Sequence, residues 1–170
     1  RIVILDKLTY AGHLATIRAE LADPRVTFVQ GDIGNRELAV HLMQAHGVQY
    51  VVNFAAESHV DRSIANPQVF LETNILGTQT LLDAARTAWT VGRDAQGCPV
   101  YREGVKYLQI STDEVYGSLA RDYEEPQPLE LDREKLGRVV MNRKNLKTYG
   151  TAFFTEETPL SPRSPYSASK

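Results

Sequence analysis

The sequence RIVILD, residues 1–6, is a continuous apolar run rich in β-branched side chains, and it ends in the carboxylate of Asp6. The same design returns in VTFVQGD at 26–32, YVVNFAAE at 50–57 and VKYLQIST at 105–112. Runs that are apolar throughout, rather than alternating, are typical of strands buried on both faces of a parallel sheet. The four runs therefore predict four such strands.

Helical patterns fill the gaps between these runs. Residues 14–21 have apolar side chains at helical spacing, and Asn35 can cap a helix that Gly47 closes. The longest candidate helix runs from Pro67, a residue suited to a first turn, to about Ala88. Strands that alternate with helices predict right-handed βαβ units, and hence an α/β fold with a Rossmann-like, doubly wound parallel sheet.

Polar residues follow all four predicted strands. Ligands of doubly wound sheets bind outside the carboxyl ends of the strands. Asp6, Asp32, the AAESH stretch at 55–59 and STDE at 111–114 come at these ends, so we expect them to line one crevice. Taken singly, Asp6 also suits a turn and Asp32 also suits a helix cap.

Composition excludes several classes of function. The net charge is −2, from 19 basic and 21 acidic residues without basic clusters, which gives no support for a nucleic-acid or anionic-membrane partner. No apolar run is long enough to span a bilayer. The single cysteine, Cys98, fits a reducing cytoplasm, and the four histidines lack metal-ligand spacing, so we expect no metal.

Residues 118–155 differ from the rest of the chain, because they are polar, contain prolines and are weakly periodic. This pattern predicts an irregular surface insertion. We expect residues 1–170 to form one partial Rossmann domain that carries this insertion.

Two pairs of residues suggest chemistry. Tyr166 and Lys170 are four residues apart, so a helix would place them on one face, where an ammonium lowers the pKa of a phenol. Adjacent Asp113 and Glu114 can reach one site only if the strand ends and the chain turns, which Gly117 permits. Two carboxylates in one crevice can act as acid and base. The alternative for Tyr166 and Lys170 is the exposed start of a helix. The alternative for Asp113 and Glu114 is that both are solvated acids of a loop.

Several motifs together carry a resemblance to a known family. DKLTYAG, GDI, NFAAESHVDRSI, TNILGTQTLLDAAR, ISTDEVYG and SPYSASK occur in this order over nearly the whole chain, except about 118–155. They resemble the nucleotide-sugar dehydratases of the extended short-chain dehydrogenase/reductase family. The resemblance implies a lyase that uses NAD as its cofactor and a nucleotide sugar as its substrate, working as a cytoplasmic homodimer.

The resemblance also implies a role for each catalytic residue. Tyr166 would remove the proton of the sugar C4 hydroxyl, Lys170 would tune it, and Thr112 would hydrogen-bond near C4. NAD would take the C4 hydride. Glu114 would then remove the C5 proton while Asp113 protonates the departing C6 hydroxyl. Return of the hydride to C6 would give a 4-keto-6-deoxy sugar.

The same resemblance assigns the cofactor contacts. They are Asp6, Lys7, Leu8 and Thr9 at the adenosine half, Asp32 and Ile33 at the adenine, and Phe54, Ala55, Ala56, Glu57, Ser58 and Thr73 along the pyrophosphate and ribose, together with Tyr166 and Lys170. Ser58 and Thr112 would also bind the substrate. His59 is a further substrate candidate, or else part of a hydrogen-bonded structural cluster.

The sequence departs from the family in two places. The eleven glycines include no G-x-x-G-x-x-G turn, so we expect these residues to lack the first, central strand with its Gly-rich loop, and also the C-terminal substrate domain. We therefore expect an incomplete sheet with unpaired edges, and a fragment that folds poorly alone, binds NAD weakly and turns over nothing. The alternatives are an epimerase or decarboxylase of the same family, or a truncated, non-catalytic binding module.

Overall fold

The structure is a computed structural model, and it describes residues 1–118, 154–155 and 157–170. The chain divides into two compact units, Arg1–Thr112 with Ser164–Lys170, and Asp113–Arg163. The insertion predicted at 118–155 lies almost entirely outside the described residues.

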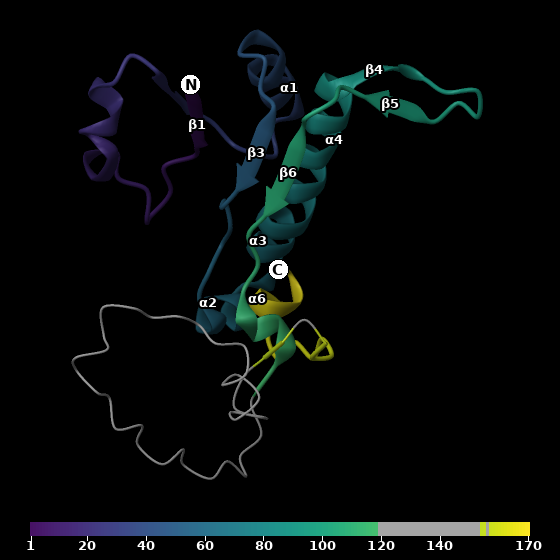
Figure 1. Cartoon of the computed structure of the whole chain (residues 1–170). Helices are drawn as coiled ribbons and strands as arrows, with labels where there is room; N and C mark the ends of the chain where they lie inside the picture. The colour runs from purple at the N-terminus through teal and green to yellow at the C-terminus, as the bar shows by residue number, and fades with distance from the viewer. Residues whose placement is uncertain (119–153, 156) are drawn as a thin grey trace, which may run out of the picture. The chain divides into compact units, whose positions relative to one another are not determined.

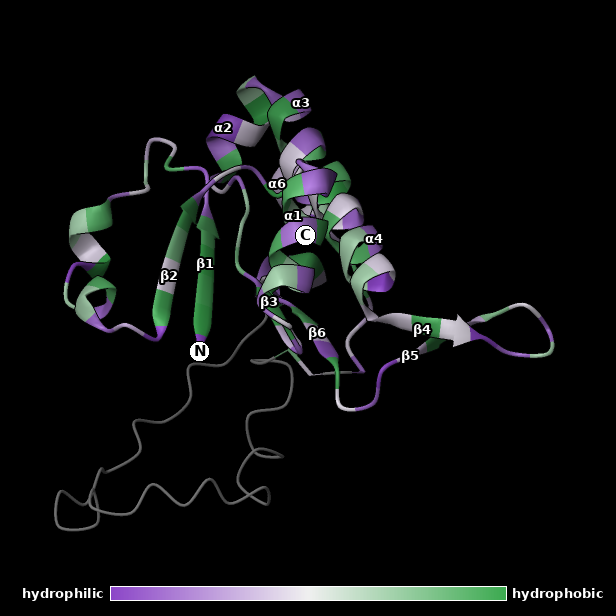
Figure 2. Cartoon of the chain, turned by 90° about the horizontal axis from the view of Figure 1, so that it is seen from above, coloured by the Kyte–Doolittle hydropathy of each residue, from purple (hydrophilic) through white to green (hydrophobic). Residues whose placement is uncertain are grey.

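The four apolar runs form strands, as predicted. β1 (Ile2–Asp6) pairs in parallel with β2 (Val26–Gln30), and β3 (Tyr50–Asn53) pairs in parallel with β6 (Lys106–Gln109). Figure 2 shows the first pair side by side, and Figure 1 shows the second. Among the described residues no strand joins β1 to β3, so the parallel strands form two separate two-stranded sheets, with the unpaired edges that the sequence predicted.

The strands β3 and β6 are covered on one face by the described residues. Val51 and Tyr107 are partly buried against the core, whereas Tyr50, Val52 and Leu108 are 62%, 48% and 54% exposed. Alternate residues of a strand point to opposite faces, so exposure follows the pleat. The prediction that both faces are buried is therefore wrong for the described part of this pair.

Two predicted helices form with the expected caps. α1 (Arg36–Ala45) begins after Asn35, whose side chain accepts a hydrogen bond from the Leu38 N–H at 3.1 Å. Gly47 follows the helix with φ +59°, the left-handed conformation that glycine adopts without strain. The long helix consists of α3 (Pro67–Phe70), a π-helical segment η3 (Leu71–Gly77) and α4 (Thr78–Trp89).

The helix predicted over 14–21 is wrong. This segment forms two 3₁₀ turns, η1 (Leu14–Ile17) and η2 (Glu20–Ala22), neither of which buries a residue. Short helices depend on packing of an apolar face, and without it the segment forms only single turns. Two short α-helices also occur, α2 (Val60–Ala65) and α6 (Pro165–Ala168).

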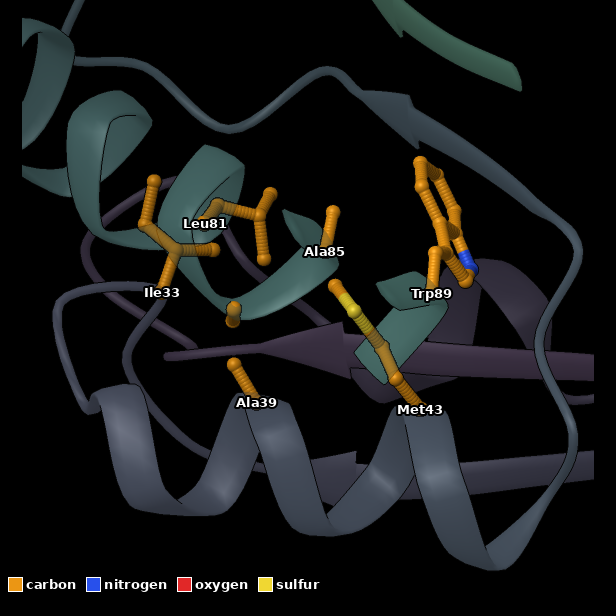
Figure 3. Packing of buried hydrophobic residues seen from close by; sticks show 7 residues of the cluster. Ile33, Ala39, Met43, Leu81, Ala85 and Trp89 are labelled. Carbon is orange, nitrogen blue, oxygen red and sulfur yellow. The ribbon is translucent and has the colours of Figure 1, made fainter. Parts of the chain in front are cut away.

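The hydrophobic core lies between α1 and α4. Figure 3 shows Ala39 and Met43 of α1 pointing toward Leu81, Ala85 and Trp89 of α4. Small alanine side chains let the two helices approach closely. The core includes Ile33 from the loop after β2, so it fixes the place of that loop.

An antiparallel hairpin follows α4 and was not predicted. β4 (Thr90–Arg93) pairs with β5 (Pro99–Tyr101), and the Asp94 side chain closes the turn by accepting hydrogen bonds from Gln96 N and Cys98 N. The exposed thiol of Cys98 lies beside this turn.

Candidate functional site

The loop after β1 folds back tightly over the end of its strand. Asp6 is the last residue of β1, and its Oδ1 accepts a hydrogen bond from Leu8 N at 2.7 Å. Leu8 has φ +55°, and Gly12 N donates to Thr9 O at 3.0 Å. A Cβ on Gly12 would lie 2.8 Å from Leu8 Cα, so this turn requires glycine. Asp6 therefore organises a turn and also stands at the predicted strand end.

The loop after β2 lies beside this first loop. Gly31 N donates to Asp6 O at 3.0 Å, and Lys7 Nζ forms an ion pair with Asp32 Oδ2 at 2.6 Å. The hydrogen-bonded Lys7 ammonium holds the pKa of Asp32 below its usual value, and Asp32 in turn raises the pKa of Lys7. Asp32 Oδ1 also accepts from Gly34 N at 2.8 Å, so it shapes the turn before α1.

The loop after β3 is anchored by a buried amide. Asn53, 3% exposed, accepts from Ala55 N at 3.1 Å and donates to Gln109 Oε1 at 2.9 Å. Along the predicted stretch, Phe54 is 72% exposed and Glu57 is buried, while the residues between them are half-buried. Between these two residues the loop therefore offers only its backbone and the small side chains of Ala55 and Ala56, in part, to solvent.

Asn74 is a site residue that the sequence analysis missed. It lies buried in the π-helical segment, next to the predicted Thr73. Its Oδ1 accepts from Glu57 N at 2.8 Å, and its Nδ2 donates to Glu57 O at 3.0 Å and to Ser169 Oγ at 2.8 Å. A polar residue inside the apolar TNILG stretch was the signal that could have revealed it.

Asn74 thereby joins the loop after β3 to the segment that carries Tyr166 and Lys170. α6 begins with a capping box, in which Ser164 Oγ accepts from Ser167 N at 3.0 Å. The Tyr166 ring meets Phe70 edge to face at 6.3 Å. Lys170 lies two residues beyond the end of α6, and its carbonyl accepts from Ser111 Oγ at 3.2 Å. Burial lowers the pKa of Lys170.

Asp113 and Glu114 begin the 3₁₀ turn η4 (Asp113–Tyr116), which opens the second unit. β6 has already ended at Gln109, and Gly117 follows the turn with φ +87°. The expectation that the strand ends before the acidic pair and that the chain then turns is confirmed. Both carboxylates are exposed, and Thr112 is the last residue of the first unit before them.

Residues that follow the acidic pair in the sequence make contacts within the second unit. Ser161 N donates to Val115 O at 2.9 Å, and the ring of Tyr116 stacks on that of Phe154 at 5.3 Å. These contacts hold the turn η4 against Phe154, at the end of the insertion, and against Ser161, which follows it.

Residues 1–131 match the protein family described as GDP-mannose 4,6 dehydratase. The chain belongs to this family. A dTDP-glucose 4,6-dehydratase of Xanthomonas campestris pv. campestris (strain B100) is 41% identical over 170 residues, which cover 100% of this chain and 39% of that protein. The low-salt glycan biosynthesis protein Agl12 of Haloferax volcanii is 41% identical over 169 residues, covering 99% of this chain and 40% of Agl12.

Two solved structures have the same fold. DesIV from Streptomyces venezuelae, a dTDP-glucose 4,6-dehydratase with NAD and TYD bound, is 39% identical with a TM-score of 0.69, covering 100% of this chain and 38% of DesIV. A UDP-Glc/GlcNAc 4-epimerase from Campylobacter jejuni, 24% identical with a TM-score of 0.66 over 99% of this chain and 38% of the epimerase, shares the fold alone. These likenesses confirm the Rossmann-type α/β fold. The chain spans about two fifths of the length of the dehydratases and Agl12.

The residues that this dehydratase-family chain presents fit the adenosine half of NAD. Asp6 is exposed at a strand end, and a carboxylate there can accept hydrogen bonds from ribose hydroxyls. The loop packs closely on Asp6 and Leu8 because Gly12 lacks a Cβ, and this packing helps to hold the Asp6 carboxylate in place. Within the described ranges, no group of His, Cys, Asp and Glu could hold a metal ion, and no helix is long and apolar enough to cross a bilayer.

Proposed function

We propose that this chain is part of an NAD-dependent dTDP-glucose 4,6-dehydratase, a lyase that converts dTDP-glucose to dTDP-4-keto-6-deoxyglucose. The observation that carries the proposal is the exposed pair Asp113 and Glu114, side by side in the turn η4. Removal of water from two neighbouring carbons needs one base and one acid, and adjacent carboxylates can supply both. The 41% identity to dehydratases along the whole chain supports the same assignment.

Three loops would hold the cofactor. Asp6, Lys7, Leu8 and Thr9 would bind the adenosine ribose, Asp32 and Ile33 the adenine, and residues 54–58 with Thr73 the pyrophosphate and second ribose. The Lys7–Asp32 ion pair and the bonds between Asn74 and Glu57 support this set, because they fix these loops before any ligand arrives. When bound, NAD supplies a reversible hydride acceptor.

The chain's own groups would handle the protons. Tyr166 would take the proton of the C4 hydroxyl, with the Lys170 ammonium nearby to favour the phenolate. Burial lowers the pKa of Lys170, so its side chain is partly withdrawn from water, as a residue that lines a site would be. Glu114 would then take the C5 proton, which the C4 ketone makes acidic, and Asp113 would protonate the C6 hydroxyl as water leaves. Thr112 and Ser58 would orient the sugar.

The assembly is a proposal of the same kind. Residues 1–170 would form part of one NAD-binding domain with a surface insertion at 118–155, in a cytoplasmic enzyme that works as a homodimer without nucleic acid or membrane. Exposed apolar side chains on the long helix, Leu71, Ile75 and Leu82 at 47%, 44% and 42%, support a protein contact there. Sedimentation velocity of the native protein tests the dimer.

The reaction itself is tested by the mass of the product. Purified native protein incubated with dTDP-glucose and NAD⁺ should release a nucleotide sugar lighter by one water molecule. An epimerase of the same fold would instead give an isomer of unchanged mass, and that result would refute the dehydratase assignment.

A further inference from the structure

Arg62 in α2 contacts two different loops of the proposed cofactor site. Its guanidinium carbon lies 3.9 Å from the centroid of the Tyr10 ring, in the loop after β1. Its NH2 lies 3.5 Å from Glu57 Oε2, in the loop after β3. One side chain therefore touches residues that the sequence separates by almost fifty positions.

The contact with Tyr10 is what orients the guanidinium. Glu57 is nearly buried, with its side chain 11% exposed, yet its Oε2 makes no hydrogen bond in the described part of the chain. At 3.5 Å the Arg62–Glu57 contact is an ion pair without a directed bond. A planar cation over an aromatic face has a preferred geometry. Tyr10 therefore fixes the position of the Arg62 guanidinium, whereas Glu57 only attracts its charge.

The backbone between the two contacts is strained. His59 has φ +81° and ψ 116° directly before α2, a conformation that side-chain-bearing residues rarely adopt. Such a residue persists only when its surroundings hold it from both sides. Asn74 holds the Glu57 backbone on one side, and Arg62 holds α2 on the other. Tyr10, His59, Asp61 and Arg62 line one shallow, solvent-open depression of the surface.

We propose that Arg62 is a positioning residue for NAD, which clasps Tyr10 to the Glu57 loop. The clasp sets the spacing between the loop that would bind adenosine and the loop that would bind pyrophosphate and the second ribose. It rests on the proposed function, because that function supplies a ligand long enough to touch both loops. A ligand that touches only the loops after β1 and β2, as AMP would, does not depend on that spacing.

The test compares a long and a short ligand in the native protein. We would measure dissociation constants for NAD⁺ and for AMP with the wild type, Tyr10→Leu and the matched control Tyr10→Phe. Tyr10 is 51% exposed, so these changes leave the core intact. Tyr10→Leu should weaken NAD⁺ binding about two- to five-fold, the loss expected for an exposed cation–π contact, and leave AMP binding unchanged. Tyr10→Phe keeps the aromatic face and should bind both ligands normally.

A double mutant identifies the partner. Arg62→Gln should weaken NAD⁺ binding in the same way, and Tyr10→Leu should then add nothing further in that background. Equal loss of AMP and NAD⁺ affinity, or full additivity of the two changes, would overturn the clasp. Wild-type protein that binds AMP but not NAD⁺ would overturn the proposed function, and the clasp with it.

Discussion

Replacing Asn74 by alanine should destabilise the protein more than any surface change in the same helix. Its side chain makes three hydrogen bonds, two of them with the Glu57 backbone and one with Ser169 Oγ. Alanine leaves the Glu57 N–H and C=O without these partners. The position is buried, because Asn74 is only 5% exposed. The change therefore removes hydrogen bonds and also leaves buried polar groups without hydrogen-bond partners.

The magnitude follows from those contacts. A hydrogen bond contributes about 0.5–1.5 kcal/mol net, and an unsatisfied buried group costs about 1–3 kcal/mol. Two unsatisfied backbone groups, the N–H and C=O of Glu57, give a loss of about 3 kcal/mol in the free energy of unfolding, within a range of roughly 2–5 kcal/mol. The loop that holds Glu57 would also lose its tie to Ser169, so the placement of Lys170 should suffer.

The assay is urea denaturation of the native protein, with Asn66→Ala as the matched control. Asn66 is exposed at the start of the same long helix, and its side chain makes no capping hydrogen bond. The control should change stability by less than about 0.5 kcal/mol. Equal stability of the Asn74→Ala and Asn66→Ala proteins would refute the assignment of Asn74 as the tie between the two segments.

Three further predictions concern the acidic pair, the ion pair and the first loop. Asp113→Asn should slow water elimination while C4 oxidation continues, and equal loss of both steps in single-turnover absorbance would contradict the role of Asp113. The Lys7–Asp32 pair lowers the Asp32 pKa, so its stabilisation is present above the ordinary pKa of the carboxyl and is lost as pH falls through the lowered value. Because both side chains are exposed, removal by Lys7→Met should cost only about 0.5 kcal/mol at neutral pH in thermal melts, and this difference should vanish in acid. Gly12→Ala places a Cβ 2.8 Å from a backbone carbon and should cost about 2 kcal/mol, whereas Gly92→Ala, which meets nothing within 4 Å, should be neutral.

Local signals in the sequence predicted much of the fold. The Asn35 cap and the Gly47 terminator depend on one residue each, and both occur as expected. The ends of β1 and β6 could be predicted because polar residues follow apolar runs. Asp6 ends β1 and the acidic pair lies in the turn after β6, as this pattern predicted.

The misses came from features that depend on distant contacts. The 14–21 segment has helical spacing but no surface to pack on, so only 3₁₀ turns form. The hairpin after α4 has strands of four and three residues, too short for any period to appear. The role of Asn74 depends on Glu57 and Ser169, and the latter lies 95 residues away. No local pattern contains such a pairing.

The most direct test of the proposed function follows the C4 hydrogen. The native protein would be given dTDP-glucose that carries deuterium at C4, with NAD⁺, and the product would be examined by mass spectrometry and NMR. An internal hydride return predicts a 4-keto-6-deoxy sugar with deuterium in the C6 methyl group. A product without deuterium at C6, or an isomer that keeps it at C4, would contradict the account.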